Sequence, residues 1–214
     1  MKQLALIRHA ATDLSGTFCG HIDPSLNPIG EAQARELVSC LRGRSFTAIY
    51  SSDLLRARQT AEFISDSLHV PLYLLPDFRE IAFGAWEGLR WNEIEARFPR
   101  EAQAWIAEYP HCAAPGGESF DAFQARVMCC VQKKISESNG PVCIVSHGGV
   151  IRLLLTQVFD VDEAEAWSLT REHAKVIDLP LTKSHREKFS ATPAVLQRVQ
   201  SSSGESNEYR NQAW

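Results

Sequence analysis

The sequence has few of the residues that mark specialised folds. It contains 12 glycines, 10 prolines and six cysteines in 214 residues, which describes an ordinary globular protein. The cysteines are too few for a disulfide scaffold of this size, and no Cys-x-x-Cys pair supports a zinc site. We therefore expect reduced thiols that are buried or incidental.

Long apolar runs and an excess of basic charge are also missing. No apolar run approaches the roughly 18 residues that span a bilayer, and the first residues do not have the pattern of a signal peptide. The 22 Lys and Arg are outnumbered by 26 Asp and Glu, so no overall basic field favours nucleic-acid binding. The sequence predicts a cytoplasmic protein without a membrane or nucleic-acid partner, in which any anion chemistry is local.

Apolar runs of strand length alternate with segments of helical periodicity. Strands are predicted at 4–7, 46–51, 70–75 and 142–145, with a last central strand at 175–181 and a further strand at 194–199 paired with it. Helices are predicted from residue 28 to the glycine at 43, over 53–68, 91–98 and 100–109, from an N-cap at Ser119 to residues 139–140, and over 150–159 and 162–167. The alternation predicts an α/β three-layer sandwich with a mostly parallel central sheet flanked by helices.

The length favours one domain over residues 1–200, although two small domains are also compatible with it. Within that domain, residues 89–118 are predicted to form an inserted helical cap segment, and residues 201–214 a polar, disordered tail. The aromatic side chains of the cap segment are candidates for stacking on a substrate, and at least half are expected in the segment's own core. These candidates are Trp91, Trp105, Tyr109 and His111.

Histidine follows two of the predicted parallel strands directly. His9 comes after the strand at 4–7, and His147 comes after the strand at 142–145 and before Gly148. Ligands of such sheets collect at the carboxyl ends of the strands, and the glycine allows a close backbone approach at a helix start, where N–H groups favour an anion. A single histidine at a strand end is more often structural, but two that meet at one edge favour a catalytic site.

Arginine residues accompany these histidines. Arg8 precedes His9, and Arg56 and Arg58 lie at the start of the helix at 53–68. Guanidinium groups match phosphate oxygens and stay charged, and a neutral imidazole can attack phosphorus. Arg58 is better explained as a surface charge. The two histidines, together with Arg8 and Arg56, predict a site for phosphoryl transfer. In such a site one imidazole attacks phosphorus, and the second imidazole and the guanidinium groups stabilise the transferred group.

A proton donor for the leaving group is expected in the loop at 78–88. Glu80 and Glu87 both lie there, and a carboxyl group buried beside Phe83 and Trp86 can keep the proton that it donates. The alternative is that both are ordinary loop charges, with Glu80 paired to Arg79.

Five ordered blocks of the sequence resemble the histidine phosphatase superfamily, which includes the phosphoglycerate mutases. The blocks lie at 6–9, 23–34, 51–61, 80–88 and 145–149. The resemblance implies a phosphoglycerate mutase-like fold, His9 as the phosphorylated nucleophile and Glu80 as the acid and then the base. It implies a phosphate pocket made by Arg8, Arg56 and His147, with no metal or organic cofactor.

Two residues depart from the family's usual pattern. Ala10 stands where the family has glycine, and Ser15 stands where it has asparagine. The Ala10 methyl group disfavours a positive φ, and the Ser15 hydroxyl can still donate to phosphate, with shorter reach. Neither change removes the nucleophile or the acid, but a non-catalytic phospholigand-binding relative stays open.

The substrate is expected to be a small phosphomonoester. Only 67 positions separate Glu80 from His147, without the long insertions of the mutases, which favours a phosphatase that admits water over a mutase. Trp86-Glu87, then Trp105, and then the segment at 115–127 are together similar to α-ribazole phosphatases. This resemblance implies α-ribazole 5′-phosphate or adenosylcobalamin 5′-phosphate as substrate, in cobalamin biosynthesis. A broad-specificity or sugar phosphatase is the alternative. The sequence leaves open whether the protein forms a homodimer.

Overall fold

The computed structural model describes residues 2–190, so the strand predicted at 194–199 and the tail at 201–214 lie outside the described residues. Five strands form one sheet in the order β3-β2-β4-β1-β5. They are β1 (Lys2–Arg8), β2 (Ala48–Ser51), β3 (Leu72–Leu74), β4 (Val142–Ser146) and β5 (Val176–Leu181). The pairs β1 with β4, β2 with β4 and β2 with β3 are parallel, whereas β5 is antiparallel to β1.

The helices follow the predicted order, with shifted ends. They are α1 (Pro28–Leu41), α2 (Leu55–Leu68), α3 (Trp91–Arg97), α4 (Pro99–Glu108), α5 (Phe120–Glu137), α6 (Gly148–Phe159), α7 (Glu163–Thr170) and α8 (Lys183–Ser190). The Ser119 side chain accepts a hydrogen bond from the N–H of Ala122, which confirms the predicted N-cap of α5. Helix α6 begins at Gly148, two residues earlier than predicted, so the glycine belongs to its first turn.

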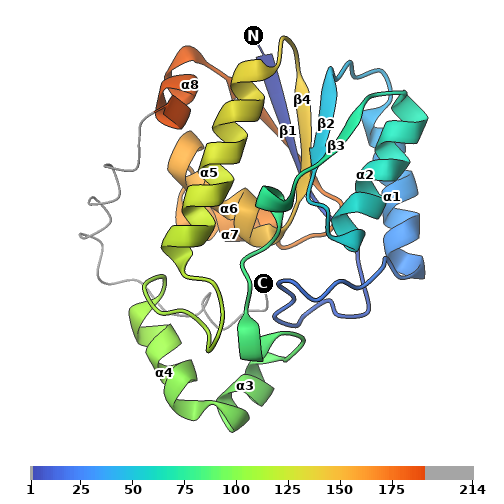
Figure 1. The fold of residues 1–214 in the computed structure, drawn as a ribbon. Coiled ribbons are helices and arrows are strands. Elements are labelled where there is room, and N and C mark those ends of the chain that lie inside the picture. Colours follow the sequence, from blue (N-terminus) through green and yellow to red (C-terminus); the bar gives the residue numbers. More distant parts are fainter. Residues whose placement is uncertain (1, 191–214) are drawn as a thin grey trace.

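The interior strand β1 shows why the helices form two layers. Leu4 and Leu6 belong to an apolar cluster with residues of α5 and α6, while Ala5 and Ile7 belong to a second cluster with residues of α1 and α2. Successive side chains of a strand point to opposite faces, so both faces of the sheet are buried. Figure 1 shows α1 and α2 on one side of the sheet and α5 and α6 on the other, which confirms the predicted α/β three-layer sandwich.

One prediction about the C-terminal part was wrong, and one helix there was not predicted. The strand predicted as a last central one is β5, which lies at the sheet edge and runs antiparallel to β1. The sequence KSHREKFS was not predicted as helical, but it forms α8. Its residues are mostly polar, so the apolar periodicity that predicts a helix is missing.

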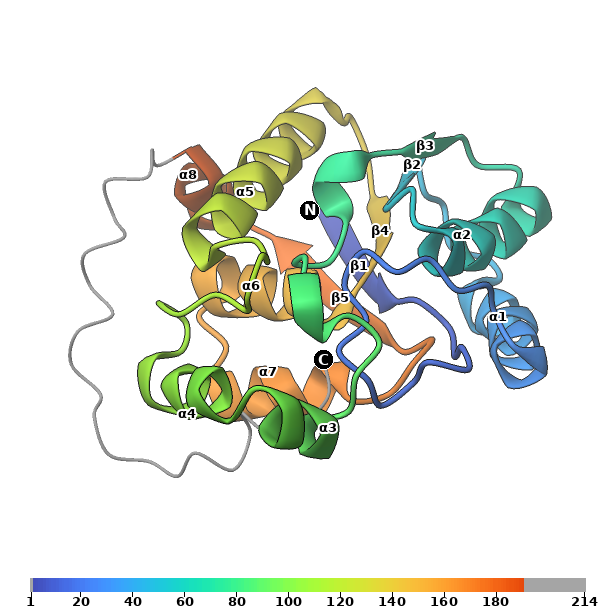
Figure 2. The same cartoon turned by 60° about the horizontal axis from the view of Figure 1, so that its bottom comes forward.

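Helices α3 and α4 lie beyond the edge at which β1, β2 and β4 end (Figures 1 and 2). They lie over an aromatic cluster in which the Trp86 and Trp105 rings are 5.2 Å apart and the Trp105 and Tyr109 rings 5.2 Å apart. Trp105 is only 2% exposed, so it belongs to the core of this segment, as expected for half of the aromatic candidates. None of the helices within residues 2–190 is long and apolar enough to cross a membrane.

Candidate active site

The parallel pairing of β1 with β4 brings two histidines to the same edge of the sheet. Arg8 lies opposite Ser146, and the N–H of His9 donates to the carbonyl of Ser146 at 2.8 Å. His9 and His147 therefore leave the sheet side by side, and their ring centroids are 5.1 Å apart. His9 is 7% exposed and His147 is 1% exposed. Residues 138 positions apart, 147 − 9, are thus joined by strand register.

Two contacts of the His9 ring define which nitrogen can attack an electrophile. Nδ1 lies 2.8 Å from the carbonyl oxygen of Ala10, and Nε2 lies 3.3 Å from the Nε of Arg56. A carbonyl oxygen only accepts a hydrogen bond and a guanidinium only donates one. We therefore assign the proton to Nδ1, which leaves the lone pair of Nε2 directed at Arg56.

Arg56 enters the site from the first turn of α2 and is fully buried. Besides its bond to His9, it donates to the carbonyl of Ile22 at 2.8 Å and to those of Cys19 and Gly20 at 3.0 and 2.8 Å. The guanidinium thus orders the loop over the pocket while keeping its positive charge beside the His9 ring. It forms no ion pair within residues 2–190.

Arg8 and His147 contain buried polar atoms without a partner in the described part of the chain. They are Nε of Arg8 and both ring nitrogens of His147. Buried polar groups are normally hydrogen-bonded, so these atoms point to a ligand that supplies acceptors. Arg8 Nη1 has partners, the carbonyls of Thr170 and Arg171 at 2.8 and 3.2 Å.

Burial sets the charge states of this site. It lowers the pKa of His9 and of His147 well below the ordinary value, with the positive charge of Arg56 as the next cause. Burial, followed by the charge of Arg152, lowers the pKa of Arg8 to about 10, which leaves the guanidinium protonated at neutral pH. Near pH 7 the site thus combines neutral imidazoles with positive guanidinium groups, the combination that a nucleophilic attack on a phosphate requires.

The two glutamates of the loop after β3 have different surroundings. Glu80 is 2% exposed, lines the pocket and accepts hydrogen bonds from the N–H groups of Ile81 and Gly149 at 3.0 and 2.8 Å. Glu87 instead accepts four backbone hydrogen bonds, from residues 20, 21, 22 and 83. Its carboxylate joins two loops, so Glu80 is the carboxyl group that is available to a ligand.

The backbone around Glu80 is held by a charged pair that the sequence did not reveal. Arg126 of α5 donates to both carboxylate oxygens of Glu118, at 2.7 and 2.8 Å. The same guanidinium donates to the carbonyls of Asp77, Arg79 and Glu80 at 2.8, 2.8 and 2.9 Å. Arg79 pairs with Asp53 rather than with Glu80, so the alternative of an Arg79 to Glu80 pair was wrong.

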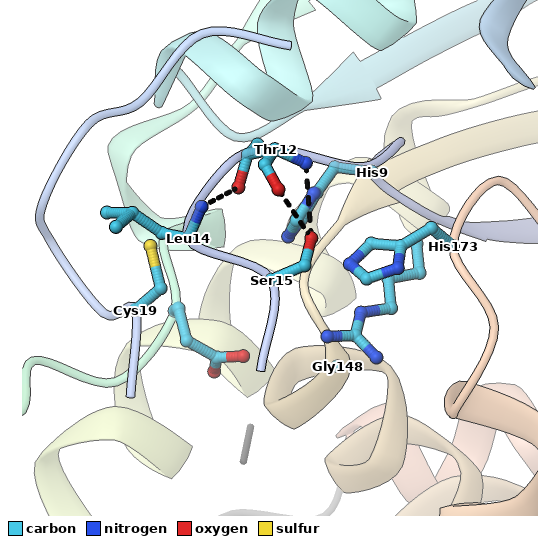
Figure 3. A pocket seen from close by; sticks show the side chains of 9 residues that line it. His9, Thr12, Leu14, Ser15, Cys19, Gly148 and His173 are labelled. Carbon is cyan, nitrogen blue, oxygen red and sulfur yellow. Dashed lines mark hydrogen bonds between the residues drawn. The ribbon is translucent and has the colours of Figure 1, made fainter. Parts of the chain in front are cut away.

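Ser15 and Gly148 also line the pocket, together with Arg8, His9 and Glu80. The Ser15 hydroxyl donates to the carbonyl of Thr12 at 2.8 Å and accepts from the N–H of Thr12 at 3.2 Å (Figure 3). A Cβ added to Gly148 would lie 3.0 Å from Nη1 of Arg152, so a larger residue there would press on that guanidinium. Both residues are thus at the pocket wall.

The Ala10 backbone does not adopt the positive φ that would favour glycine there. Its side chain is fully buried in a small cluster with Leu26 and Ala34, and its N–H donates to the Thr60 hydroxyl at 3.0 Å. The methyl group is therefore accommodated by packing, without strain in the loop that follows the nucleophile.

Among the pocket residues that sequence reasoning missed is His173, whose ring centroid lies 5.3 Å from that of His9. It comes three residues before β5, in which Val176 lies opposite Ile7. Because β5 is antiparallel to β1, its beginning lies at the carboxyl edge of β1. The sequence predicts a last central strand in a mostly parallel sheet, and such a strand begins at the opposite edge. The apolar run of β5 carries no signal of its true direction, so His173 was not placed at the site.

The chain is similar to known phosphatases over most of its length. A model of the histidine phosphatase superfamily (branch 1) matches residues 4–192. The chain is 31% identical over 168 residues to the adenosylcobalamin/α-ribazole phosphatase of Salmonella typhimurium, covering 77% of this chain and 83% of that protein. It is 32% identical over 170 residues to the metal-independent phosphoserine phosphatase of Arabidopsis thaliana, covering 77% and 71%. The crystal structure of the α-ribazole phosphatase from Shigella flexneri matches with a TM-score of 0.77 and 27% identity, over 85% of this chain and 92% of that one.

Proposed function

The chain belongs to the histidine phosphatase superfamily, as the match to residues 4–192 shows, and on that premise we propose that His9 is its phosphorylated nucleophile. The protein is a phosphatase with the phosphoglycerate mutase-like α/β fold that the sequence predicted. The observation that carries the proposal is the His9 ring, whose Nε2 lone pair lies beside the Arg56 guanidinium and 5.1 Å, centroid to centroid, from the unpartnered His147 ring.

In the first half of the reaction, Nε2 of His9 attacks phosphorus and the ester oxygen leaves. Arg8, Arg56 and His147 donate hydrogen bonds to the non-bridging oxygens, where negative charge is concentrated. Glu80 gives its proton to the leaving oxygen, so the products are an alcohol and phosphorylated His9. The two backbone N–H donors from Ile81 and Gly149 then hold the resulting carboxylate in place.

In the second half, Glu80 accepts a proton from a water molecule whose oxygen attacks phosphorus. The bond from phosphorus to His9 breaks, inorganic phosphate leaves, and both side chains return to their starting states. No metal enters these steps. Within residues 2–190, no group of three or more His, Cys, Asp or Glu side chains could hold a metal ion.

Two further residues of the pocket wall complete the proposed site. The N–H of Gly148 lies at the N-terminus of α6, where helix geometry favours a phosphate oxygen. The Ser15 hydroxyl reaches a phosphate oxygen by exchanging its bond to the Thr12 carbonyl for one to the ligand. Both residues are assigned to substrate binding rather than to the chemistry.

As the substrate we propose α-ribazole 5′-phosphate or adenosylcobalamin 5′-phosphate, and hence a step in cobalamin biosynthesis. The support is the similarity to phosphatases named for these compounds, one by sequence and one by structure. A broad-specificity or sugar phosphatase is the alternative, and the similarity to a phosphoserine phosphatase favours keeping it.

Hydrolysis of p-nitrophenyl phosphate in excess chelator tests the mechanism. The wild-type protein is expected to be active, and His9→Ala is expected to lose at least ~10⁴-fold in kcat, because no other group replaces the nucleophile. Glu80→Gln serves as a second variant that keeps size but loses the proton. Strict dependence on added metal, or an active His9→Ala, would exclude the mechanism.

A panel of phosphomonoesters tests the leaving group. Values of kcat/KM for α-ribazole 5′-phosphate are compared with those for phosphoserine and sugar phosphates, with the expectation that the first is highest. Isomer formation from phosphoglycerates in excess of phosphate release would instead identify a mutase. Phosphate binding without turnover of any ester would identify the non-catalytic relative.

A further inference from the structure

His173 lies where an additional ligand of the phosphoryl group would lie. It is in the loop between α7 and β5 and lines the same pocket as Arg8, His9 and Glu80. Its ring centroid is 5.3 Å from that of His9, nearly the same separation as between His147 and His9. Figure 3 shows the His173 imidazole beside His9 and Ser15, on the wall of the pocket.

The loop that carries His173 is fixed to the residue before the nucleophile. Arg8 Nη1 donates to the carbonyls of Thr170 and Arg171 at 2.8 and 3.2 Å, and the N–H of Ala174 donates to the carbonyl of Arg8 at 3.0 Å. These hydrogen bonds lie on both sides of His173 in the sequence. The imidazole is therefore held in position relative to His9 by the backbone rather than by a contact of its own.

The backbone next to His173 is strained. Ala174 has a φ of 53°, in the left-handed region that residues with a Cβ adopt only at a steric cost. Strained conformations of this kind persist where the surrounding structure requires them, and they are concentrated at binding and catalytic sites. Here the unusual backbone turns the chain from α7 into β5 while directing His173 toward the pocket.

The His173 ring has hydrogen-bonding capacity that the described protein does not use. Within residues 2–190, neither ring nitrogen has a hydrogen-bond partner. Its neighbours are the cations Arg8 and Arg56, which offer no acceptor for its N–H group. An acceptor that suits all three side chains is an anion.

We propose that His173 is a third imidazole of the phosphate site and that its ring N–H donates a hydrogen bond to a non-bridging oxygen of the bound phosphoryl group. This inference rests on the proposed function and adds a substrate-binding residue to it. Hydrogen bonds to charged groups change affinity by about ten- to a hundredfold, so His173 is expected to contribute to phosphate affinity on that scale. The nucleophile and the acid are unchanged.

Calorimetric binding of inorganic phosphate and of orthovanadate tests the hydrogen bond directly. His173→Ala removes the ring, and His173→Phe keeps a ring without N–H groups. His173→Asn and His173→Gln carry an amide N–H near the positions of Nδ1 and Nε2. The matched control is His69→Asn, which removes an exposed histidine outside the pocket, at a left-handed position that asparagine also adopts.

The Ala and Phe variants are expected to bind both anions about ten- to a hundredfold more weakly than wild type. At least one amide variant and the His69→Asn control are expected to stay within about threefold. Wild-type affinity in His173→Phe would overturn the proposal, because the ring would then act by packing. Equal losses in the Ala, Asn and Gln variants would also overturn it, because a donor would then restore nothing.

Binding and turnover separate this proposal from the proposed function. If the wild-type protein binds phosphate but hydrolyses no ester, the proposed function fails while the affinities still decide the role of His173. If the protein hydrolyses esters and all His173 variants bind phosphate equally well, only the role of His173 fails. A contact with the leaving group would change KM for large esters without changing phosphate affinity, and that result also rejects the hydrogen bond proposed here.

Discussion

Two regions of the molecule hold charged or polar side chains wholly or partly away from solvent, and the hydrogen bonding of these groups differs between the two regions. In the phosphate pocket, formed by Arg8, His9, Arg56 and His147, one guanidinium nitrogen and two imidazole nitrogens have no partner within residues 2–190. In the loop clamp, formed by Glu87, Glu118 and Arg126, each charged group makes several hydrogen bonds. The polar groups of the pocket are thus available to a ligand, whereas those of the clamp are hydrogen-bonded within the protein.

The contrast indicates which buried charges serve stability. A paired and hydrogen-bonded charge costs stability when its partner is removed, because the remaining charge stays buried alone. An unpartnered polar group already carries that cost, so its replacement by an apolar residue can be stabilising. Stability is therefore expected to respond in opposite ways in the two regions, rising when a pocket group is replaced and falling when a clamp group is removed.

The pocket is tested most strongly by His147→Leu, which replaces an unpartnered ring by an apolar side chain. We expect a loss of about 10²- to 10³-fold in kcat, because a donor to the transferred group is removed. We also expect the free energy of unfolding to rise by about 1 kcal/mol. His147 makes no side-chain capping bond to α6, so none is lost. Enzyme assays and urea unfolding measure both effects, and a clear loss of stability would break the comparison.

The clamp is tested by Arg126→Met, which keeps part of the apolar stem and removes the guanidinium. The variant leaves Glu118 and three carbonyl groups without their hydrogen-bond donor. We therefore expect the free energy of unfolding to fall by about 3 kcal/mol. Because the Glu80 backbone loses its support, kcat should also fall by about tenfold.

The matched control for Arg126→Met is Arg58→Met. Arg58 forms an exposed pair with Glu62 one helical turn away, so its removal should leave stability nearly unchanged. Urea unfolding of both variants measures the difference. Equal stability of the two variants would show that the clamp does not stabilise the fold.

The pocket also predicts how stability depends on pH. Burial, followed by the charges of Arg8 and Arg56, lowers the pKa of His173 from 6.5 to about 3. Above pH 6.5 neither state binds the proton, so there is no effect. Below it, the unfolded imidazole takes up a proton that the native ring does not, and stability falls until about pH 3. His9 and His147 act in the same direction.

His173→Gln removes one of these imidazoles. An imidazole that is protonated only in the unfolded state lowers the free energy of unfolding by about 1.4 kcal/mol for each pH unit below its unfolded pKa. Between pH 6.5 and about pH 5, the free energy of unfolding should therefore fall by ~2 kcal/mol less in the variant than in wild type. Urea unfolding at both pH values gives the difference. Equal losses of stability in wild type and in His173→Gln would contradict a neutral, desolvated His173 ring.

The same contrast explains what the sequence could predict. His9 and His147 were predicted together because both follow apolar runs, and parallel strands meet at one edge. From the residues alone, the roles of Glu80 and Glu87 could not be separated, because the difference lies in N–H donors from residues 20–22, far away in the sequence. Only the family resemblance indicated Glu80. Clamp contacts of this kind depend on tertiary structure, and no local pattern marks them.

His173 and Arg126 were missed for two further reasons. The apolar run of β5 does not reveal its direction, and direction alone decides whether His173 lies at the site or at the opposite edge. Arg126 lies on α5, where Phe123 and Val127 account for the apolar face and a neighbouring arginine reads as a surface charge. Its contacts to the loop of Glu80 appear only when the helix is packed.

The smallest effect is expected for Ser15, whose hydroxyl belongs partly to each region. It lines the pocket, but it also bonds to Thr12 in the same way that the clamp residues bond to the backbone. When phosphate binds, the Ser15 hydroxyl exchanges one hydrogen bond for another. Ser15→Ala should therefore lower the affinity for phosphate by only about threefold, less than the loss of a newly formed hydrogen bond would. Ser15→Asn, with a longer donor, should restore it. A loss above about tenfold in Ser15→Ala would place this hydroxyl fully with the phosphate pocket, because only an unexchanged bond to a charged group is worth that much.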